Sequence, residues 1–372
     1  MINMRRKEKI LGYTFDDVLI VPTFNDEVIS RKDIEKSSVI KNISGKEIRL
    51  SLPIFSAPMS YFWKDFAEVF TKNKLLFTVP RINRPLEERI NLIENLGEGG
   101  EYTAISIGPR EIENQSFREK FEKNLDYYSF ILVDTAFGST NLVAGVLDYL
   151  NFLGIDRGVI VGNIASVEGL YYLVKNTWDK YKEIIIRVGI GSGSACTTRL
   201  MSGVGFPQMS ILEIIAKVLG KTDLDKGIHE LSEEFLWEYE DLIEKVKEGF
   251  SVKIISDGGI KHYGDIAKAL VFSDFIMSGK LFISKEMETY DKNTGIVQYY
   301  GMASTHVGNK YAEGGVYLSK DPPNLEEIIN TINYALGSSM SYVGAKSLEE
   351  FRRKADFVQV SVRTWFSENG VG

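Results

Sequence analysis

Short apolar runs alternate with amphipathic segments along the chain from about residue 50 onward. Eight of these runs have the length and continuous hydrophobicity of strands buried on both faces of a parallel sheet. Helical spacing of apolar residues appears between them, for example over residues 86–93 and 142–150. Eight strands, each followed by a helix-length segment, predict an α/β fold of the (β/α)8 TIM-barrel type rather than an open doubly wound sheet. The eight runs are residues 52–56, 75–79, 102–106, 130–134, 158–162, 184–188, 252–256 and 275–278.

Two segments interrupt this alternation. Residues 221–250 are strongly charged and longer than a crossover requires, so we expect a helical insertion on the surface. Residues 303–325 contain several glycines and a Pro-Pro pair, which predict a short mobile loop. A helix over 325–334 and a terminal strand over 357–360 are predicted after it. Because no repeat, low-complexity tract or linker is present, we expect a single domain over residues 1–372.

Composition and charge narrow the class of protein. The net charge of −7 argues against nucleic-acid binding, since phosphate backbones favour basic surfaces. One cysteine excludes an internal disulfide and fits a reducing compartment. No apolar run reaches the ~18 residues that a membrane span needs, and the charged N-terminus lacks the apolar core of a secretory signal. We therefore expect a cytoplasmic protein with no membrane partner.

Polar or glycine residues follow most of the predicted strands. In a TIM barrel the C-terminal ends of the strands converge on one face, where ligands bind. A functional site is therefore predicted there, although each strand end taken alone is also ordinary loop sequence. The strand ends concerned are residues 56–59, 134–138, 162–163, 189–196, 257–259 and 278–280.

Residues 188–199 contain the only cysteine, Cys196, directly after a turn rich in glycine and serine. Such a turn presents backbone N–H groups that suit a phosphate, or carbonyl groups that suit a cation. A thiol in this position can meet a ligand that the backbone already holds. A lone cysteine is more often a small buried apolar residue, but the glycines before it and the two threonines after it favour a functional role.

The segment Gly191-Ser-Gly-Ser-Ala-Cys-Thr-Thr-Arg199, followed by Gly203-Val-Gly-Phe-Pro-Gln208, closely resembles the cysteine loop of the IMP dehydrogenases and GMP reductases. Further segments resemble motifs of this family in the right order, and together they span nearly the whole chain. They are residues 14–22, 52–59, 257–260, 264–269, 299–302 and 339–344.

The resemblance implies a purine nucleoside monophosphate across the barrel mouth and chemistry at C2 of its base. Cys196 is then the covalent nucleophile, because C2 accepts or donates hydride poorly until a nucleophile adds to it. Thr198 matches the threonine that helps to move protons. The substrate-binding residues implied are Met59 and Met302 at the base, Asp257 at the ribose, Ser194, Gly259, Gly279 and Tyr299 at the phosphate, and Gly258 and Gly301 within the same motifs.

The resemblance also implies a nicotinamide cofactor, NADPH or NAD, beside Asp134, Gly138 and Arg187. The absence of a Gly-x-Gly-x-x-Gly fingerprint after the first strand fits a barrel that holds the dinucleotide in its loops. Carbonyl groups of Gly191, Gly193 and Cys196 match a site for a monovalent cation such as K⁺. The family's barrels are usually tetramers, so a homotetramer is expected.

Features outside the cysteine loop bear on the reaction. Residues 81–86 occupy the place where most IMP dehydrogenases carry regulatory modules, and the loop over 302–313 is too short for the dehydrogenase flap. The water-activating Arg-Tyr pair of that flap has no counterpart, since only Lys310 and Tyr311 are present. These features favour a GMP reductase, which converts GMP and NADPH to IMP and ammonia. The reductases' ammonia-protonating glutamate is also missing, because Thr305 stands in its place, with His306 and Glu313 as candidate substitutes.

Two alternatives remain open. One is an IMP dehydrogenase without regulatory modules, or a relative that acts on a modified purine nucleotide. The other is a nucleotide-binding protein that has lost turnover, which the two missing catalytic features favour. Beside the site, Ala57, Ser60, Phe137 and Lys280 depart from the family pattern. Lys280 is included among the substrate-binding residues because a cation there suits a phosphate.

Overall fold

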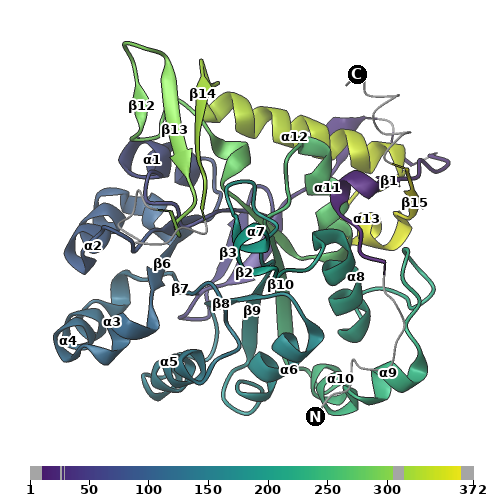
Figure 1. Ribbon diagram of the computed structural model, residues 1–372, viewed down its shortest axis with the longest axis horizontal. Coiled ribbons are helices and arrows are strands. Elements are labelled where there is room, and N and C mark those ends of the chain that lie inside the picture. The colour runs from purple at the N-terminus through teal and green to yellow at the C-terminus, as the bar shows by residue number, and fades with distance from the viewer. Residues whose placement is uncertain (1–10, 26, 29, 305–313, 362–372) are drawn as a thin grey trace.

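The computed structural model describes residues 11–25, 27–28, 30–304 and 314–361 (Figure 1). Eight parallel strands follow one another around its central sheet, and the two sheet edges meet where Phe55 and Leu76 form a parallel bridge. The amide of Ser56 donates to the carbonyl of Leu76 at 3.1 Å across this junction. The predicted TIM barrel is therefore confirmed. Its strands are β4 (Ile54–Ser56), β5 (Phe77–Val79), β6 (Thr103–Ile107), β7 (Phe130–Asp134), β8 (Val159–Ile164), β9 (Glu183–Val188), β10 (Ser251–Asp257) and β11 (Phe275–Ser278).

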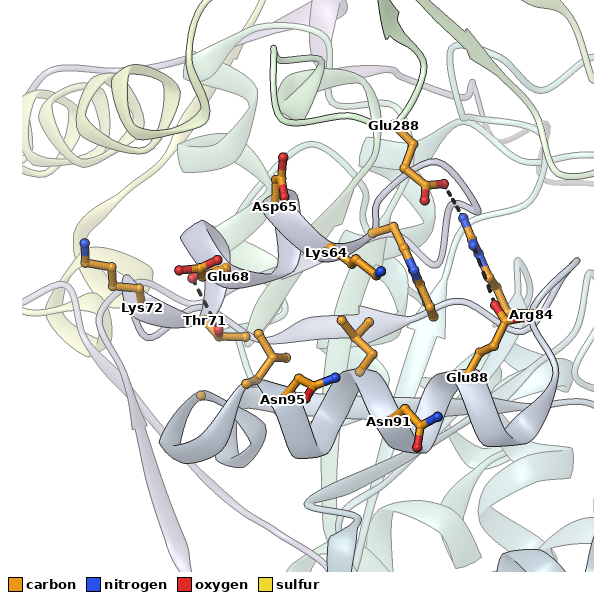
Figure 2. A pocket seen from close by; sticks show the side chains of 14 residues that line it. Lys64, Asp65, Glu68, Thr71, Lys72, Arg84, Glu88, Asn91, Asn95 and Glu288 are labelled. Atoms are coloured by element: carbon orange, nitrogen blue, oxygen red, sulfur yellow. Dashed lines mark hydrogen bonds and ion pairs between the residues drawn. The ribbon is translucent and has the colours of Figure 1, made fainter.

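Helices surround the barrel, as Figure 1 shows. Helix α5 (Asn141–Phe152) illustrates why: Val143, Val146, Leu147 and Leu150 share one face and are buried against the strands. Further helices are α1 (Lys64–Lys72), α2 (Leu86–Asn95), α3 (Pro109–Glu113), α4 (Gln115–Lys123), α6 (Val167–Lys175), α8 (Gln208–Val218), α11 (Tyr263–Phe272), α12 (Leu325–Tyr342) and α13 (Leu348–Lys354). A cleft lies between α1 and α2 on the outside of the barrel (Figure 2).

The inside of the barrel is a packed core that is closed at the N-terminal ends of the strands. An antiparallel hairpin, β2 (Ser38–Lys41) and β3 (Glu47–Leu50), places Ile40 and Ile48 in the same apolar cluster as Phe130 and Phe275. These two phenylalanines begin β7 and β11. The hairpin therefore covers one end of the barrel, and the opposite end carries the polar strand ends.

A small antiparallel sheet extends from the C-terminal face of the barrel (Figure 1). It consists of β12 (Tyr290–Asp291), β13 (Ile296–Tyr300) and β14 (Val316–Lys320), which we call the finger sheet. The prediction of a mobile loop over 303–325 is wrong for its last part, because β14 pairs with β13 in regular register. Residues 305–313 lie outside the described residues, and so do the sequence predictions that concern Thr305, His306, Lys310, Tyr311 and Glu313.

The terminal strand and the helix after the finger sheet are confirmed. Strand β15 (Phe357–Gln359) pairs with β1 (Val18–Ile20), and α12 covers the predicted 325–334 and continues to Tyr342. None of the helices in the described part of the chain is long and apolar enough to cross a membrane.

Residues 221–250 are only partly helical, in contrast to the long helical insertion predicted. They contain two short helices, α9 (Glu233–Trp237) and α10 (Glu240–Lys247), after a stretch of turns. A buried carboxylate fixes these turns: Glu213 accepts hydrogen bonds from the amides of Ile228 (2.8 Å) and His229 (2.7 Å) and from Lys217 (3.0 Å). Burial lowers the pKa of His229 below its ordinary value. The charge of nearby Lys217 lowers this pKa further, while the carboxylate of Glu213 raises it.

Candidate active site

A cavity of about 450 Å³ opens at the C-terminal ends of the barrel strands. Its wall gathers residues from loops that are far apart in sequence. Nearly every residue predicted to form the site lines this cavity, namely Met59, Asp134, Arg187, Gly191, Gly193, Ser194, Cys196, Thr198, Asp257, Gly258, Gly259, Gly279, Lys280, Tyr299, Gly301 and Met302.

Gly138 is the exception, and its predicted contact with a cofactor stays a prediction. It packs against the end of β8 instead of lining the cavity. Its amide donates to the carbonyl of Asn163 at 2.7 Å, and a Cβ at this position would lie 2.9 Å from the Cα of Gly162. Glycine is needed there for close backbone packing.

The cysteine loop leaves β9 through a backbone that only glycine adopts readily. Gly189 has φ +151°, and a Cβ on it would lie 1.9 Å from the carbonyl oxygen of Asp257. The loop then turns so that the amide of half-buried Cys196 donates to the carbonyl of Gly193 at 3.0 Å. The thiol donates to Oγ1 of Thr198 at 3.1 Å, where the short helix α7 (Thr198–Ser202) begins. A potential nucleophile and a hydroxyl thus lie side by side in the cavity wall.

The finger sheet packs directly on the cysteine loop. The amide of Gly315 donates to the carbonyl of Ala195 at 2.9 Å, and Gly314 forms a bridge with Cys196. A Cβ on Gly301 would lie 2.8 Å from the Ala195 carbonyl oxygen and 2.9 Å from the Cα of Gly314. The cysteine is therefore held from the side opposite the barrel by the ends of β13 and β14.

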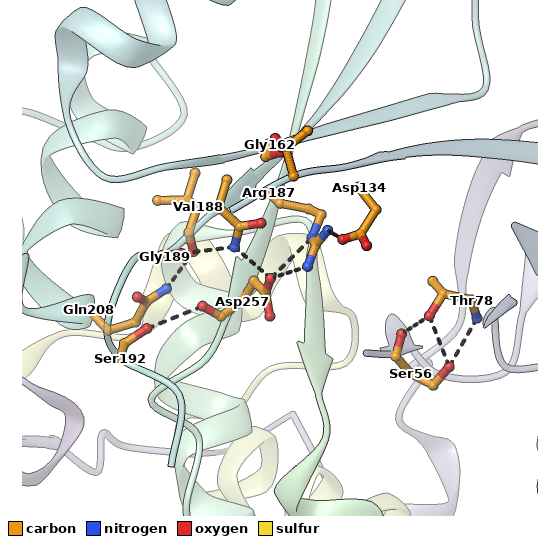
Figure 3. A network of polar contacts seen from close by, with 12 residues as sticks. Ser56, Thr78, Asp134, Gly162, Arg187, Val188, Gly189, Ser192, Gln208 and Asp257 are labelled. Carbon is orange, nitrogen blue, oxygen red and sulfur yellow. Dashed lines mark hydrogen bonds and ion pairs between the residues drawn. The ribbon is translucent and has the colours of Figure 1, made fainter. Parts of the chain in front are cut away.

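Arg187, on β9, joins two carboxylates under the cavity (Figure 3). Its Nη1 donates to Asp134 at 3.0 Å, while Nε and Nη2 donate to one oxygen of Asp257 at 3.0 and 2.8 Å. Arg81 also donates to Asp134 (3.1 Å), and Asn163 also donates to Asp257 (2.7 Å). Burial disfavours the charged guanidinium, but the carboxylates of Asp257 and Asp134 outweigh it and raise the pKa of Arg187. The five side chains form one alternating network across β7, β8, β9, β10 and the loop after β5.

This network leaves Oδ1 of Asp257 without a hydrogen-bond partner among the residues that the structure describes, since all three bonds end on Oδ2. A carboxylate oxygen in this situation can accept from hydroxyl groups of a ligand. The next two residues, Gly258 and Gly259, have φ +93° and +77° and make a tight turn. The amide of Gly259 donates to the carbonyl of Ser192 at 2.9 Å, so this N–H group is engaged between loops rather than directed at a ligand.

The sequence did not assign a role to Arg81 or Asn163, although both line the cavity. Arg81 follows β5 by two residues, and Asn163 was noted only as a strand end, so their position after strands was the available signal. Lys280 begins the short 3-10 helix Lys280–Phe282 at the cavity and has no ion-pair partner among the described residues. An unpaired lysine at this place favours an anionic ligand.

Two methionines from different loops line the cavity. Met59 approaches Gly279 closely, since a Cβ there would lie 3.5 Å from its Cγ. Met302 accepts a hydrogen bond at Sδ from the amide of Ser60 at 3.4 Å. The arrangement combines a thiol, a neighbouring hydroxyl, an available carboxylate oxygen and a cation around a partly apolar space. It suits covalent attack on an aromatic ligand that carries hydroxyl and anionic groups.

Comparison with known proteins places this geometry in a family. The model described as "IMP dehydrogenase / GMP reductase domain" matches residues 98–228 and 241–370, well over half of the chain. Residues 229–240, which separate the two matched ranges, lie within the segment 221–250 predicted as an insertion.

Three curated relatives are similar along almost their whole length. Inosine-5'-monophosphate dehydrogenase of Cryptosporidium parvum is 25% identical, with 94% of this chain and 92% of that protein aligned. GMP reductase of Buchnera aphidicola subsp. Schizaphis graminum is 26% identical over 96% of both chains. Human GMP reductase 1 is 27% identical over 96% of this chain and 98% of its own. The chain belongs to the IMP dehydrogenase / GMP reductase family of oxidoreductases, which act on purine nucleotides.

Proposed function

We propose that this protein is a GMP reductase, which uses NADPH to convert GMP to IMP and ammonia through a covalent intermediate on Cys196. The observation that carries the proposal is the thiol of Cys196 at 3.1 Å from the Thr198 hydroxyl, in the same cavity as the available oxygen of Asp257. A nucleophile, a proton-transferring group and a ribose-binding carboxylate are what chemistry at C2 of a purine nucleotide requires.

The nucleotide is expected to lie across the cavity from Asp257 to Lys280. Oδ1 of Asp257 accepts from the ribose hydroxyls, and Lys280 contributes its charge to the phosphate. We assign to the phosphate side six further residues that line the cavity, namely Ser194, Gly258, Gly259, Gly279, Tyr299 and Gly301. The base lies between Met59 and Met302, whose soft side chains adapt to a flat ring. This placement brings C2 to the thiol.

The reaction then takes two steps at C2. The thiolate adds to C2 of GMP, and the exocyclic amine leaves as ammonia with a proton relayed by Thr198. Hydride then adds to C2, the C–S bond breaks, and the thiolate is restored. The balance is GMP, NADPH and two protons giving IMP, NADP⁺ and an ammonium ion.

The cavity wall between β5 and β7 fits the nicotinamide end of the cofactor. Ile82, Thr135 and Ala136 give it a small, mostly uncharged surface beside Cys196, with Arg81, Asp134 and Arg187 behind it. Bound NADPH supplies the hydride that replaces the amine. The protein's part is to exclude water from C2 and to hold the charged network rigid. Carbonyl groups of Gly191, Gly193 and Cys196 would hold the monovalent cation, and we also propose a cytoplasmic homotetramer.

The reductase direction is supported by short connections beside the site. Residues 80–85 alone join β5 to α2, which leaves no room for regulatory modules. Only residues 301–315 join β13 to β14, which leaves little chain for a hydrolytic flap. The second candidate is an IMP dehydrogenase, which oxidises IMP to XMP with NAD. It is kept because the Cryptosporidium parvum dehydrogenase aligns over 92% of its own length, so missing modules do not exclude that reaction.

The decisive assay offers the purified protein GMP with NADPH and, separately, IMP with NAD⁺, while the reduced cofactor is followed by absorbance. Oxidation of NADPH that depends on GMP and releases ammonia is the expected result. Turnover only in the second mixture contradicts the reductase and supports the dehydrogenase. Tight GMP binding by calorimetry with no turnover in either mixture favours a binding protein that has lost catalysis.

A further inference from the structure

Two loops that form the active site touch each other beneath its cavity. They are the cysteine loop and the turn Asp257–Gly259, which we call the Asp257 turn. The hydroxyl of Ser192 donates to the carbonyl of Asp257 at 3.3 Å, and the amide of Gly259 donates to the carbonyl of Ser192 at 2.9 Å. A Cβ on Gly258 would lie 2.5 Å from Oγ of Ser192 and 3.0 Å from the amide nitrogen of Gly193. The position of the thiol relative to the Asp257 carboxylate therefore depends on how these two loops are held together.

Gln208 lies against both loops and bonds to the strand that leads into each. It is the first residue of α8 and is 1% exposed. Its Nε2 donates to the carbonyl of Val188 at 2.7 Å (Figure 3) and to Oγ of Ser256 at 3.3 Å. Val188 ends β9 before the cysteine loop, and Ser256 precedes Asp257 on β10. One amide group therefore bonds to both strands at the points where the two loops leave them.

The side chain of Gln208 also packs between two glycines, one from each loop. A Cβ on Gly259, which has φ +77°, would lie 3.1 Å from Cβ and 3.2 Å from Cγ of Gln208. A Cβ on Gly189, which has φ +151°, would lie 2.9 Å from Oε1 of Gln208. Because neither loop has space to shift toward it, the Gln208 side chain fixes the separation between them.

The hydrogen bonds of Gln208 are not those of a residue that serves stability alone. Val188 sets the orientation of the amide, because a rotated amide would place Oε1 against a carbonyl oxygen. In this orientation Oε1 is buried without a hydrogen-bond partner among the residues that the structure describes. An unpartnered buried oxygen costs ~1–3 kcal/mol. Such a departure from full hydrogen bonding is expected at positions that serve a functional site.

We propose that Gln208 is a positioning residue, which sets the distance between the Cys196 thiol and C2 of a nucleotide held by Asp257. The inference rests on the proposed function, in which Asp257 binds the ribose and Cys196 attacks C2. Attack requires the reacting atoms to lie ~3–3.5 Å apart, and a misplacement of ~1 Å slows a reaction ~10²-fold. Loss of the Gln208 amide should therefore slow formation of the C–S bond more than it weakens nucleotide binding.

The 2-chloro analogue of IMP tests this step without the cofactor. Chloride stands at C2 in place of the exocyclic amine of GMP. The thiolate adds to C2, chloride leaves with the electron pair of the C–Cl bond, and a stable thioether remains. Intact mass follows the adduct, and its dependence on analogue concentration separates the maximal rate from the half-saturating concentration. In Gln208→Met we expect the maximal rate to fall at least ~10-fold, while the half-saturating concentration stays within ~threefold of wild type.

Three comparisons separate positioning from a general weakening of the fold. Alkylation of Cys196, the only cysteine, by iodoacetamide needs no bound nucleotide, so its rate should change little in Gln208→Met. Glu213→Gln alters a fully buried polar residue on the same helix, outside the cavity lining, and should leave adduct formation unchanged. Gln208→Glu keeps the shape of the side chain, but only its protonated carboxyl donates to Val188. Because burial raises the pKa of such a carboxyl, the adduct rate of Gln208→Glu relative to wild type should be higher at about pH 6 than at about pH 9.

The outcomes distinguish this inference from the proposed function. If wild type forms the adduct and Gln208→Met forms it at the same maximal rate, or if iodoacetamide alkylation slows equally, the role of Gln208 is overturned and the proposed function stands. A wild-type rate for Gln208→Glu at both pH values overturns the role in the same way, even where Gln208→Met is too unstable to measure. Absence of the adduct in wild type contradicts the placement of C2 at the thiol, and the proposed function and this inference then fall together.

Discussion

Replacing Arg187 by methionine should destabilise the protein strongly, because it leaves two buried carboxylates without their shared cation. Arg187 is 6% exposed and bonds to Asp134 at 3.0 Å and to Asp257 at 2.8 Å. Methionine keeps the unbranched apolar stem of the side chain, so the loss measured is mainly that of the guanidinium group.

The size of the effect follows from what remains bonded. Breaking a buried ion pair by removing one partner costs ~3–5 kcal/mol. Asp134 keeps Arg81 and Asp257 keeps Asn163, so we expect about 3 kcal/mol, at the lower end of that range. At ~2 °C per kcal/mol for a large domain, the midpoint of thermal unfolding should fall by about 6 °C.

Thermal unfolding of wild type, Arg187→Met and Arg187→Lys should be compared at about pH 8. Arg187→Lys restores a cation without the fork and should be intermediate. A midpoint for Arg187→Met within ~1 °C of wild type refutes the reasoning.

Three other substitutions give separate predictions. Lys280→Ala should raise the KM for GMP about tenfold, which corresponds to ~1.4 kcal/mol, because it removes the unpaired cation at the cavity. The kcat should change little. An unchanged KM would show that Lys280 does not bind the substrate. Gly301→Ala should lower kcat at least ~10-fold, because the new methyl group lies within 2.9 Å of Ala195 and Gly314. The far-UV circular dichroism spectrum should stay unchanged. An unaltered kcat contradicts a role for the finger sheet in holding Cys196. Because burial lowers the pKa of His229, the folded state disfavours the charged ring, so stability holds above pH 6.5 and falls below it. In His229→Gln, the free energy of unfolding from urea titrations should fall less steeply between about pH 7.5 and 5.5. The same dependence on pH in wild type and variant would show that the histidine does not contribute.

The barrel was predictable because its strands are buried on both faces and read as continuous apolar runs. Residues 130–134 and 275–278 coincide with β7 and β11, and the other six differ only at their ends. Strand β14 escaped prediction for the opposite reason. Most of its residues are exposed, and its apolar run, Val316 to Leu318, is only three residues long and follows a glycine pair.

The site was predictable as a set of strand ends, but its internal contacts were not. The sequence placed Asp134, Arg187 and Asp257 at the same face of the barrel. Their shared network depends on the register of β7, β9 and β10, which the sequence does not specify. The sequence also gave no sign of the packing role of Gly138, which lies against the backbone of Gly162 where a Cβ has no space.

The most direct test of the account is the behaviour of Cys196→Ala with GMP and NADPH. The account predicts that turnover is abolished while the Kd for GMP, from calorimetry, stays within about tenfold, or ~1.4 kcal/mol, of wild type. Wild-type protein quenched during turnover should carry a purine nucleotide mass on the peptide that contains Cys196. Full activity in Cys196→Ala would contradict the covalent mechanism.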